Sequence, residues 1–174
     1  GDHVRGLGAI VDGMSWYFAG FNRNKRSLTL DLKSDAGKAV LRRLLADADV
    51  LVENYRPGVL AAMGFDRETL DAINPRLVVG SVNGYGSPGP YRDRPAFDFI
   101  TQAMSGFMSV NGSQESGPMR AAPPLTDLIA GLYTAFAIVA ALRVRDRDGE
   151  GQAVEASMMG GMMSMLAYLS AAQL

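Results

Sequence analysis

The stretch Asp49-Val50-Leu51-Val52-Glu53, followed by Asn54-Tyr55-Arg56-Pro57-Gly58, decides the fold class of this chain. Three consecutive apolar residues between polar ones predict a short buried strand, and the Pro-Gly pair ends it. Similar strands are predicted over 76–82 and 152–156, with helical segments between the strands. Strands that are separated by helices pair in parallel through right-handed crossovers, so we expect an α/β fold.

Outward from this strand, the spacing of apolar residues predicts the other elements. We expect short strands over 15–21 and 27–31, a helix over 35–48 with Ser34 as N-cap, a helix from Asp66 to Ile73, and an irregular loop over 83–95. The second half is predicted to be mostly helical, with helices over 98–109, 127–145 and 158–172 and a polar loop over 111–118. The prediction is therefore a single partial domain over 1–174, with a parallel Rossmann-like sheet in an α/β part (about 15–97) and a helical part (about 98–174).

Composition excludes several kinds of chemistry. The 174 residues include no cysteine and one histidine, His3, so thiolate nucleophiles, disulfides and Cys-built metal sites are excluded, and multi-His sites and Ser-His-Asp triads are disfavoured. We expect no metal. The net charge of −1 offers no overall attraction to nucleic acid or anionic membrane, so neither is expected as a partner.

The ends and the apolar segments indicate where the chain acts. No basic stretch followed by an apolar one marks a leader, so we expect a cytoplasmic protein. Gly, Thr, Tyr and Ser interrupt the apolar segments 128–142 and 156–169, which favours buried helices over membrane spans. The start at Gly1 and the apolar end at Leu174 suggest part of a longer chain.

Asp127 is the most unusual residue, because it precedes a run of apolar side chains at a predicted helix start. One interpretation is an N-cap, which would accept main-chain N–H bonds and stabilise the helix by about 0.5–2 kcal/mol. The other is a carboxylate nucleophile, which needs neither Cys nor His. The residues alone leave both open.

Three other motifs are candidates for ligand binding. The basic cluster 22–26 could bind phosphate or could be solvated, and Asn54–Gly58 could form either a ligand-binding edge or only a turn. Gly84–Gly89 imitates a dinucleotide-binding loop, but Pro88 removes an amide donor and no helix follows, so that interpretation is rejected. The methionines of 158–165 favour core or interface packing over a metal site.

Taken in order, the segments 22–33, 49–58, 74–77, 84–86 and the stretch around Asp127 resemble the class III CoA-transferases (CaiB/BaiF, formyl-CoA transferase type). The resemblance implies acyl-CoA and carboxylic acid substrates, no permanently bound cofactor, and an interlinked homodimer. It also implies that the family's opening strand lies before Gly1 and its glycine-rich loop after Leu174.

The resemblance assigns roles to individual residues. Asp127 would attack the acyl-CoA thioester, forming a mixed anhydride and then an aspartyl-CoA thioester. Arg94 would neutralise a phosphate, and the CoA site would be lined by Leu30, Lys33, Asn54, Tyr55 and Met63. Ala62 stands where the family has an arginine, so we expect that phosphate contact either to be weakened or to be supplied elsewhere, with Arg56 and Arg67 as the candidates.

Three alternatives remain. The related α-methylacyl-CoA racemases carry a histidine where this chain has Phe97, which cannot exchange a proton. The chain could also be a CoA-binding or assembly fragment without catalysis, or a purely structural α/β piece.

Overall fold

The computed structural model describes residues 2–172. The chain divides into two compact units, with the boundary between Leu41 and Arg42. The first unit holds the 3₁₀ helix η1 (His3–Gly6), the antiparallel pair β1 (Ile10–Val11) and β2 (Met14–Ser15), and helix α1 (Trp16–Asn22). The predicted single domain over 1–174 stays a prediction.

Both strands predicted near the start of the chain are wrong. Residues 16–22 form α1 because Ser15 caps it, its Oγ accepting a hydrogen bond of 3.1 Å from the Phe18 N–H. Residues 27–31 form neither helix nor strand. An alternating pattern becomes a strand only when a neighbouring strand supplies hydrogen bonds, and among the described residues none pairs with this segment.

Helix α2 (Asp35–Ala46) forms as predicted, and Ser34 is its cap: Ser34 Oγ accepts a hydrogen bond of 3.1 Å from the Gly37 N–H. Its carboxyl end, which belongs to the second unit, is held by a side chain of that unit. The Asn74 side-chain amide donates to the carbonyls of Leu45 and Ala48 at 3.0 and 2.9 Å, which satisfies acceptors that the helix itself leaves unpaired.

The second unit contains the predicted parallel sheet. Strands β3 (Val50–Glu53), β4 (Val78–Asn83) and β7 (Ala153–Ser157) lie in the order β3-β4-β7, with Val50 opposite Val78 and Val79 opposite Ala153. The α/β fold class is therefore confirmed. Strand β3 is less buried than predicted, and Val52 is 59% exposed, because β3 is an edge strand in the described chain.

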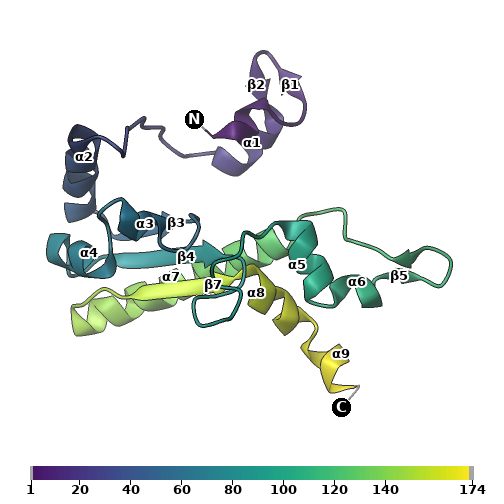
Figure 1. Cartoon of the computed structure of the whole chain (residues 1–174). Coiled ribbons are helices and arrows are strands. Elements are labelled where there is room, and N and C mark those ends of the chain that lie inside the picture. Colours follow the sequence, from purple (N-terminus) through teal and green to yellow (C-terminus); the bar gives the residue numbers. More distant parts are fainter. Residues whose placement is uncertain (1, 173–174) are drawn as a thin grey trace. The chain divides into compact units, whose positions relative to one another are not determined.

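Helices connect and cover these strands. Between β3 and β4 lie α3 (Val59–Ala62) and α4 (Arg67–Ile73), and Asp66 caps α4 as predicted. The long helix α7 (Leu125–Asp148) directly precedes β7 in the sequence and packs against both β4 and β7 (Figure 1). The packing is close at Gly80: a Cβ there would lie 2.6 Å from Cδ1 of Ile138.

Two helices predicted as continuous are broken. The 98–109 segment forms α5 (Asp98–Met104) and α6 (Phe107–Val110), because Gly106 adopts a positive φ of 86° between them. The 158–172 segment forms α8 (Met158–Met165) and α9 (Ala167–Ala171). The polar loop holds the short hairpin β5 (Gly112–Ser113) and β6 (Gly117–Pro118).

The core of the second unit lies on both sides of β4. Its buried apolar side chains are Leu45, Phe65, Leu70, Leu77, Val78, Val79, Ala130, Ala141, Met158 and Met162. Two of the methionines of α8 thus pack in this core, in keeping with the packing interpretation of the methionine-rich segment.

Helix α7 is not buried all round, contrary to the prediction. Leu132, Phe136 and Val139 are 73%, 76% and 65% exposed on the described chain. By length and composition alone α7 is also able to cross a membrane, although its other side packs on the sheet.

Candidate active site

The carboxyl ends of the parallel strands form one edge of the sheet, the usual ligand-binding edge of α/β proteins. The strands are joined there by side chains. The Asn54 amide, just after β3, donates a hydrogen bond of 2.7 Å to the Val82 carbonyl on β4. Asn83, at the end of β4, accepts one of 2.6 Å from the Gly86 N–H.

Asp127 lies at this edge because of the way α7 leads into β7. The chain reverses at Gly149–Gly151, and β7 then runs back along α7, so the start of α7 lies where β7 ends and α8 begins (Figure 1). The approach is close, since a Cβ on Gly161 of α8 would lie 2.9 Å from Cγ2 of Ile129.

The structure argues against Asp127 as the helix cap. Helix α7 begins at Leu125, so Asp127 is its third residue, and the Asp127 carboxylate accepts no hydrogen bond from residues 2–172. The capping carboxylate belongs to Asp98 on α5. Oδ1 of Asp98 accepts bonds of 2.8 Å from the Thr126 N–H and 2.9 Å from the Thr126 hydroxyl.

The electrostatics of Asp127 follow from this arrangement. Its side chain is open to solvent on one side, and burial on the other raises the pKa of its carboxyl above the ordinary value. The negative charge of Asp98 raises the pKa further. A carboxylate that is partly desolvated and accepts no hydrogen bond from the described residues keeps its lone pairs available, as a nucleophile requires.

Two other predicted CoA contacts of this unit, Tyr55 and Met63, lie in the segment that follows β3. Tyr55 lines a cavity of about 260 Å³ together with Glu53, Ser87 and Glu155. Its N–H bonds Glu53 Oε2 at 2.8 Å. Met63 is half-buried and ends α3. Asn54 bonds to β4, as described above.

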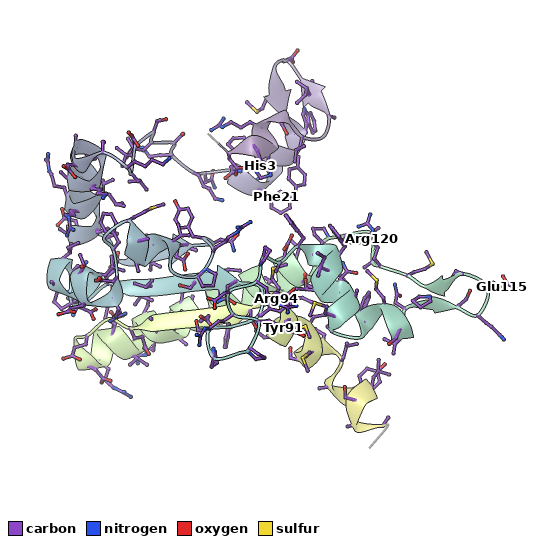
Figure 2. All side chains as sticks on the ribbon, viewed as in Figure 1. His3, Phe21, Tyr91, Arg94, Glu115 and Arg120 are labelled. Carbon is purple, nitrogen blue, oxygen red and sulfur yellow. The ribbon has the colours of Figure 1, made fainter. Side chains whose placement is uncertain are left out.

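The predicted phosphate contacts differ in availability. Arg94 lies in the loop before α5, where its guanidinium sits 4.1 Å from the centre of the Tyr91 ring (Figure 2). Arg67 is held by Asp71 through contacts of 2.6 and 2.7 Å. Arg56 is exposed and forms no ion pair within residues 2–172. Of the two arginines that could replace the one missing at Ala62, Arg56 is the more available.

Leu30 and Lys33 belong to the first unit. Leu30 lines a cavity of about 450 Å³ there, with Arg5, Lys25 and Arg26 on its wall, which brings part of the basic cluster to a concave surface. Lys33 is exposed, and its N–H donates to Asp31 Oδ1 at 3.0 Å.

The residues around Asp98 were not predicted from the sequence. Thr101, Gln102 and Thr126 are buried polar residues that bond to Asp98 or to one another. A signal was present: Asp98, Thr101 and Gln102 have the i, i+3, i+4 spacing of one helix face, and a polar face on a packed helix predicts a buried network. Phe97, at the position of the racemase histidine, is 61% exposed.

A sheet edge with an unbonded, partly desolvated carboxylate defines a site suited to acyl transfer. The model of CoA-transferase family III matches residues 1–174, and the chain belongs to this family.

Its relatives include named transferases. The chain is 40% identical over 169 residues to the acetyl-CoA:oxalate CoA-transferase of Acetobacter aceti, covering 97% of this chain and 43% of that protein. It is 43% identical over 166 residues to the formyl-CoA:oxalate CoA-transferase of Bradyrhizobium sp. ORS 278, covering 95% and 39%. The chain thus spans about two-fifths of the length of these relatives.

The fold is also that of a solved family structure. A CaiB/BaiF family protein from Brucella suis superposes with a TM-score of 0.92 at 38% identity, over 98% of this chain and 46% of that one. The predicted family is therefore confirmed by both sequence and fold.

Proposed function

We propose that this chain carries the nucleophile of a CoA-transferase, which moves CoA from an acyl-CoA to a carboxylic acid through Asp127. The observation that carries the proposal is the Asp127 carboxylate itself: it lies at the carboxyl edge of the sheet, is partly desolvated, and leaves the capping of its helix to Asp98. The family of the chain supports the same reaction.

The reaction is balanced without a cofactor. An Asp127 oxygen attacks the thioester carbonyl, the C–S bond breaks, and CoA leaves as thiolate. The thiolate then attacks Cγ of Asp127 in the mixed anhydride, which releases the donor acid and leaves an aspartyl-CoA thioester. The acceptor carboxylate displaces CoA from Cγ, and CoA returns to the acceptor's carbonyl, which regenerates Asp127.

The binding residues would have separate tasks in this reaction. Leu30, Lys33, Asn54, Tyr55 and Met63 would contact CoA, while Arg94 and Arg56 would meet its phosphates with exposed guanidinium groups. Charged phosphates are bound well by arginine because its planar group donates two parallel hydrogen bonds.

The test is chemical trapping in the full-length gene product. The protein is incubated with formyl-, acetyl- or succinyl-CoA, and hydroxylamine converts an activated aspartate to its hydroxamate, which peptide mass spectrometry locates. We expect the hydroxamate at Asp127, and its loss together with transferase activity in Asp127→Ala. Asp35→Ala, which removes the first-turn carboxylate of α2, is the matched control and should keep both. Full activity of Asp127→Ala would refute the proposal.

A second candidate is CoA binding without catalysis, in which the cavity of about 260 Å³ lined by Tyr55 would take part. Calorimetric titration with CoA measures binding, and the trapping experiment above reports the Asp127 adduct. Binding without the adduct supports the second candidate.

We also propose that the protein is a cytoplasmic homodimer in which Leu132, Phe136 and Val139 of α7 are covered. Exposed apolar side chains on one helix face favour burial against another surface. Light scattering of the full-length gene product tests the dimer, and cell fractionation tests the location.

A further inference from the structure

We infer that a buried polar network at the start of α7, formed by Asp98, Thr101, Gln102 and Thr126, holds Asp127 in place for its reaction, with Thr126 and Gln102 as positioning residues. The inference rests on the proposed function, because it assigns these residues a role relative to the nucleophile. Asp127 alone touches the reacting atoms.

The network is dry. Thr101, Gln102 and Thr126 each have 0% of their surface exposed. Buried polar groups destabilise a fold unless they are hydrogen-bonded, so an apolar set would be the simpler way to pack α5 on α7. The presence of polar rather than apolar side chains between α5 and α7 is therefore not explained by packing alone.

Thr126 is held through both its main chain and its side chain. Its N–H and hydroxyl meet Asp98 Oδ1 at 2.8 and 2.9 Å, and its hydroxyl lies 2.6 Å from that of Thr101. Three contacts to α5 fix the first turn of α7 in rotation as well as in position. Thr126 directly precedes Asp127, so this turn sets the Cα and Cβ of the nucleophile.

Gln102 extends the network to the segment before α7. Its Nε2 donates to Asp98 Oδ2 at 2.6 Å, and its Oε1 accepts from the Ala121 N–H at 2.8 Å. The donor and acceptor ends of the amide are thus both assigned by their partners. The Asp98 carboxylate is bonded at both oxygens and cannot rotate toward Asp127.

Asp98 and Asp127 have different roles at the start of α7, and this difference suits a nucleophile. Asp98 accepts the N–H of Thr126 in the first turn of α7, so the main chain next to Asp127 is fixed while the Asp127 carboxylate stays unbonded among the described residues. Misplacement of a reacting group by about 1 Å costs about 10²-fold in rate, which is why rigid support of such a group matters.

The test compares Thr126→Val, which removes the hydroxyl, with Thr126→Ser, which keeps it, in the full-length gene product. The donor is the acyl-CoA of the panel above that labels Asp127 fastest. We expect Thr126→Val to slow labelling of Asp127 by about 10- to 100-fold with little change in KM for the donor. Thr126→Ser should restore most of the rate.

The matched control is Thr134→Val on the same helix. Thr134 is also buried, but its hydroxyl bonds only to the Ala130 carbonyl of its own helix, at 2.8 Å. This variant should lower the melting temperature without slowing labelling. If Thr126→Val does not fold, Thr101→Val breaks the same hydroxyl pair from α5 and should show the same split between rate and KM.

Two results would overturn the inference alone: labelling of Asp127 at the unmodified rate in Thr126→Val, or equal slowing in Thr134→Val. Absence of any Asp127 label in the unmodified protein would instead overturn the proposed function, and the positioning role with it.

Discussion

Oδ1 of Asp98 on α5 lies 2.8 Å from the main-chain nitrogen of Thr126 on α7. The cap of the longest helix in the described chain is thus supplied from another helix, 28 residues earlier in the sequence. One consequence is that a fixed negative charge stands close to Asp127, the next residue along. Packing, charge and the candidate nucleophile are therefore coupled through one contact.

We predict that Asp98→Asn shifts the acid limb of the pH–rate profile to lower pH. The Asp98 charge raises the pKa of Asp127, and removing that charge lowers it, so the reactive carboxylate persists at lower pH. The measurement is kcat/KM, or the rate of Asp127 labelling, across pH.

Other charges near the start of α7 leave this prediction unambiguous. Helix α8 carries no charged residue, Asp98 is the sole one on α5, and Glu155 of β7 is bonded to Ser87. Asp148→Asn, at the far end of α7, is the control and should leave the midpoint in place. A midpoint that stays or rises in Asp98→Asn would contradict the prediction.

Asp127→Asn is expected to stabilise the fold at neutral pH. Because the folded pKa of Asp127 is raised, the folded state binds more protons than the unfolded one above the ordinary pKa, and stability falls as pH rises through the folded pKa. The asparagine removes that loss. We expect a rise in melting temperature of about 1 °C at pH 7, which is small because the side chain is partly open to solvent. This rise should become smaller as the pH is lowered toward 4.

For Asp66→Asn we expect a change in melting temperature of the opposite sign. Hydrogen bonds from Thr69 lower the pKa of the Asp66 carboxyl, so its ionised form stabilises the fold above the ordinary pKa and this contribution is lost as pH falls through the folded value. The variant should lower the melting temperature at pH 7. Shifts of the same sign in both variants would show that the reasoning is wrong.

Gly80→Ala should destabilise the second unit by about 1–3 kcal/mol, because the added methyl would collide with Ile138 where α7 packs on β4. Gly131→Ala is the matched change, since a Cβ on this glycine of α7 meets nothing within 4 Å, and it should stabilise by up to about 1 kcal/mol. Urea denaturation measures both. Shortening the partner in Gly80→Ala/Ile138→Val should recover part of the loss, and a lack of recovery would count against this contact as the cause.

Arg56→Ala should weaken CoA binding more than Arg67→Ala does. Arg67 is already paired with Asp71, whereas Arg56 is free among the described residues to meet a phosphate. An exposed ionic contact is worth about 1 kcal/mol, so we expect a loss of about fivefold in affinity for Arg56→Ala, smaller at high salt. Calorimetry at two salt concentrations checks this, and a larger effect of Arg67→Ala would refute it.

Local rules predicted the elements whose signals lie within a few residues. The strand after Asp49, the Ser34 and Asp66 caps and the parallel sheet are present in the structure, because each depends on near-neighbour sterics and hydrogen bonds. The same rules failed at 16–22, where the Ser15 cap outweighed the pattern assumed for a strand, and at Gly106, whose backbone divides a predicted helix.

The sequence by itself determined the family, the α/β class and the choice of Asp127 as a chemically capable residue, since these follow from residue types and their order along the chain. Only the tertiary structure decided that Asp127 is not the cap of its helix. That outcome depends on Asp98, Gln102 and Thr126 meeting across two helices, and such a contact is set by the packing of α5 on α7 rather than by the sequence around Asp127.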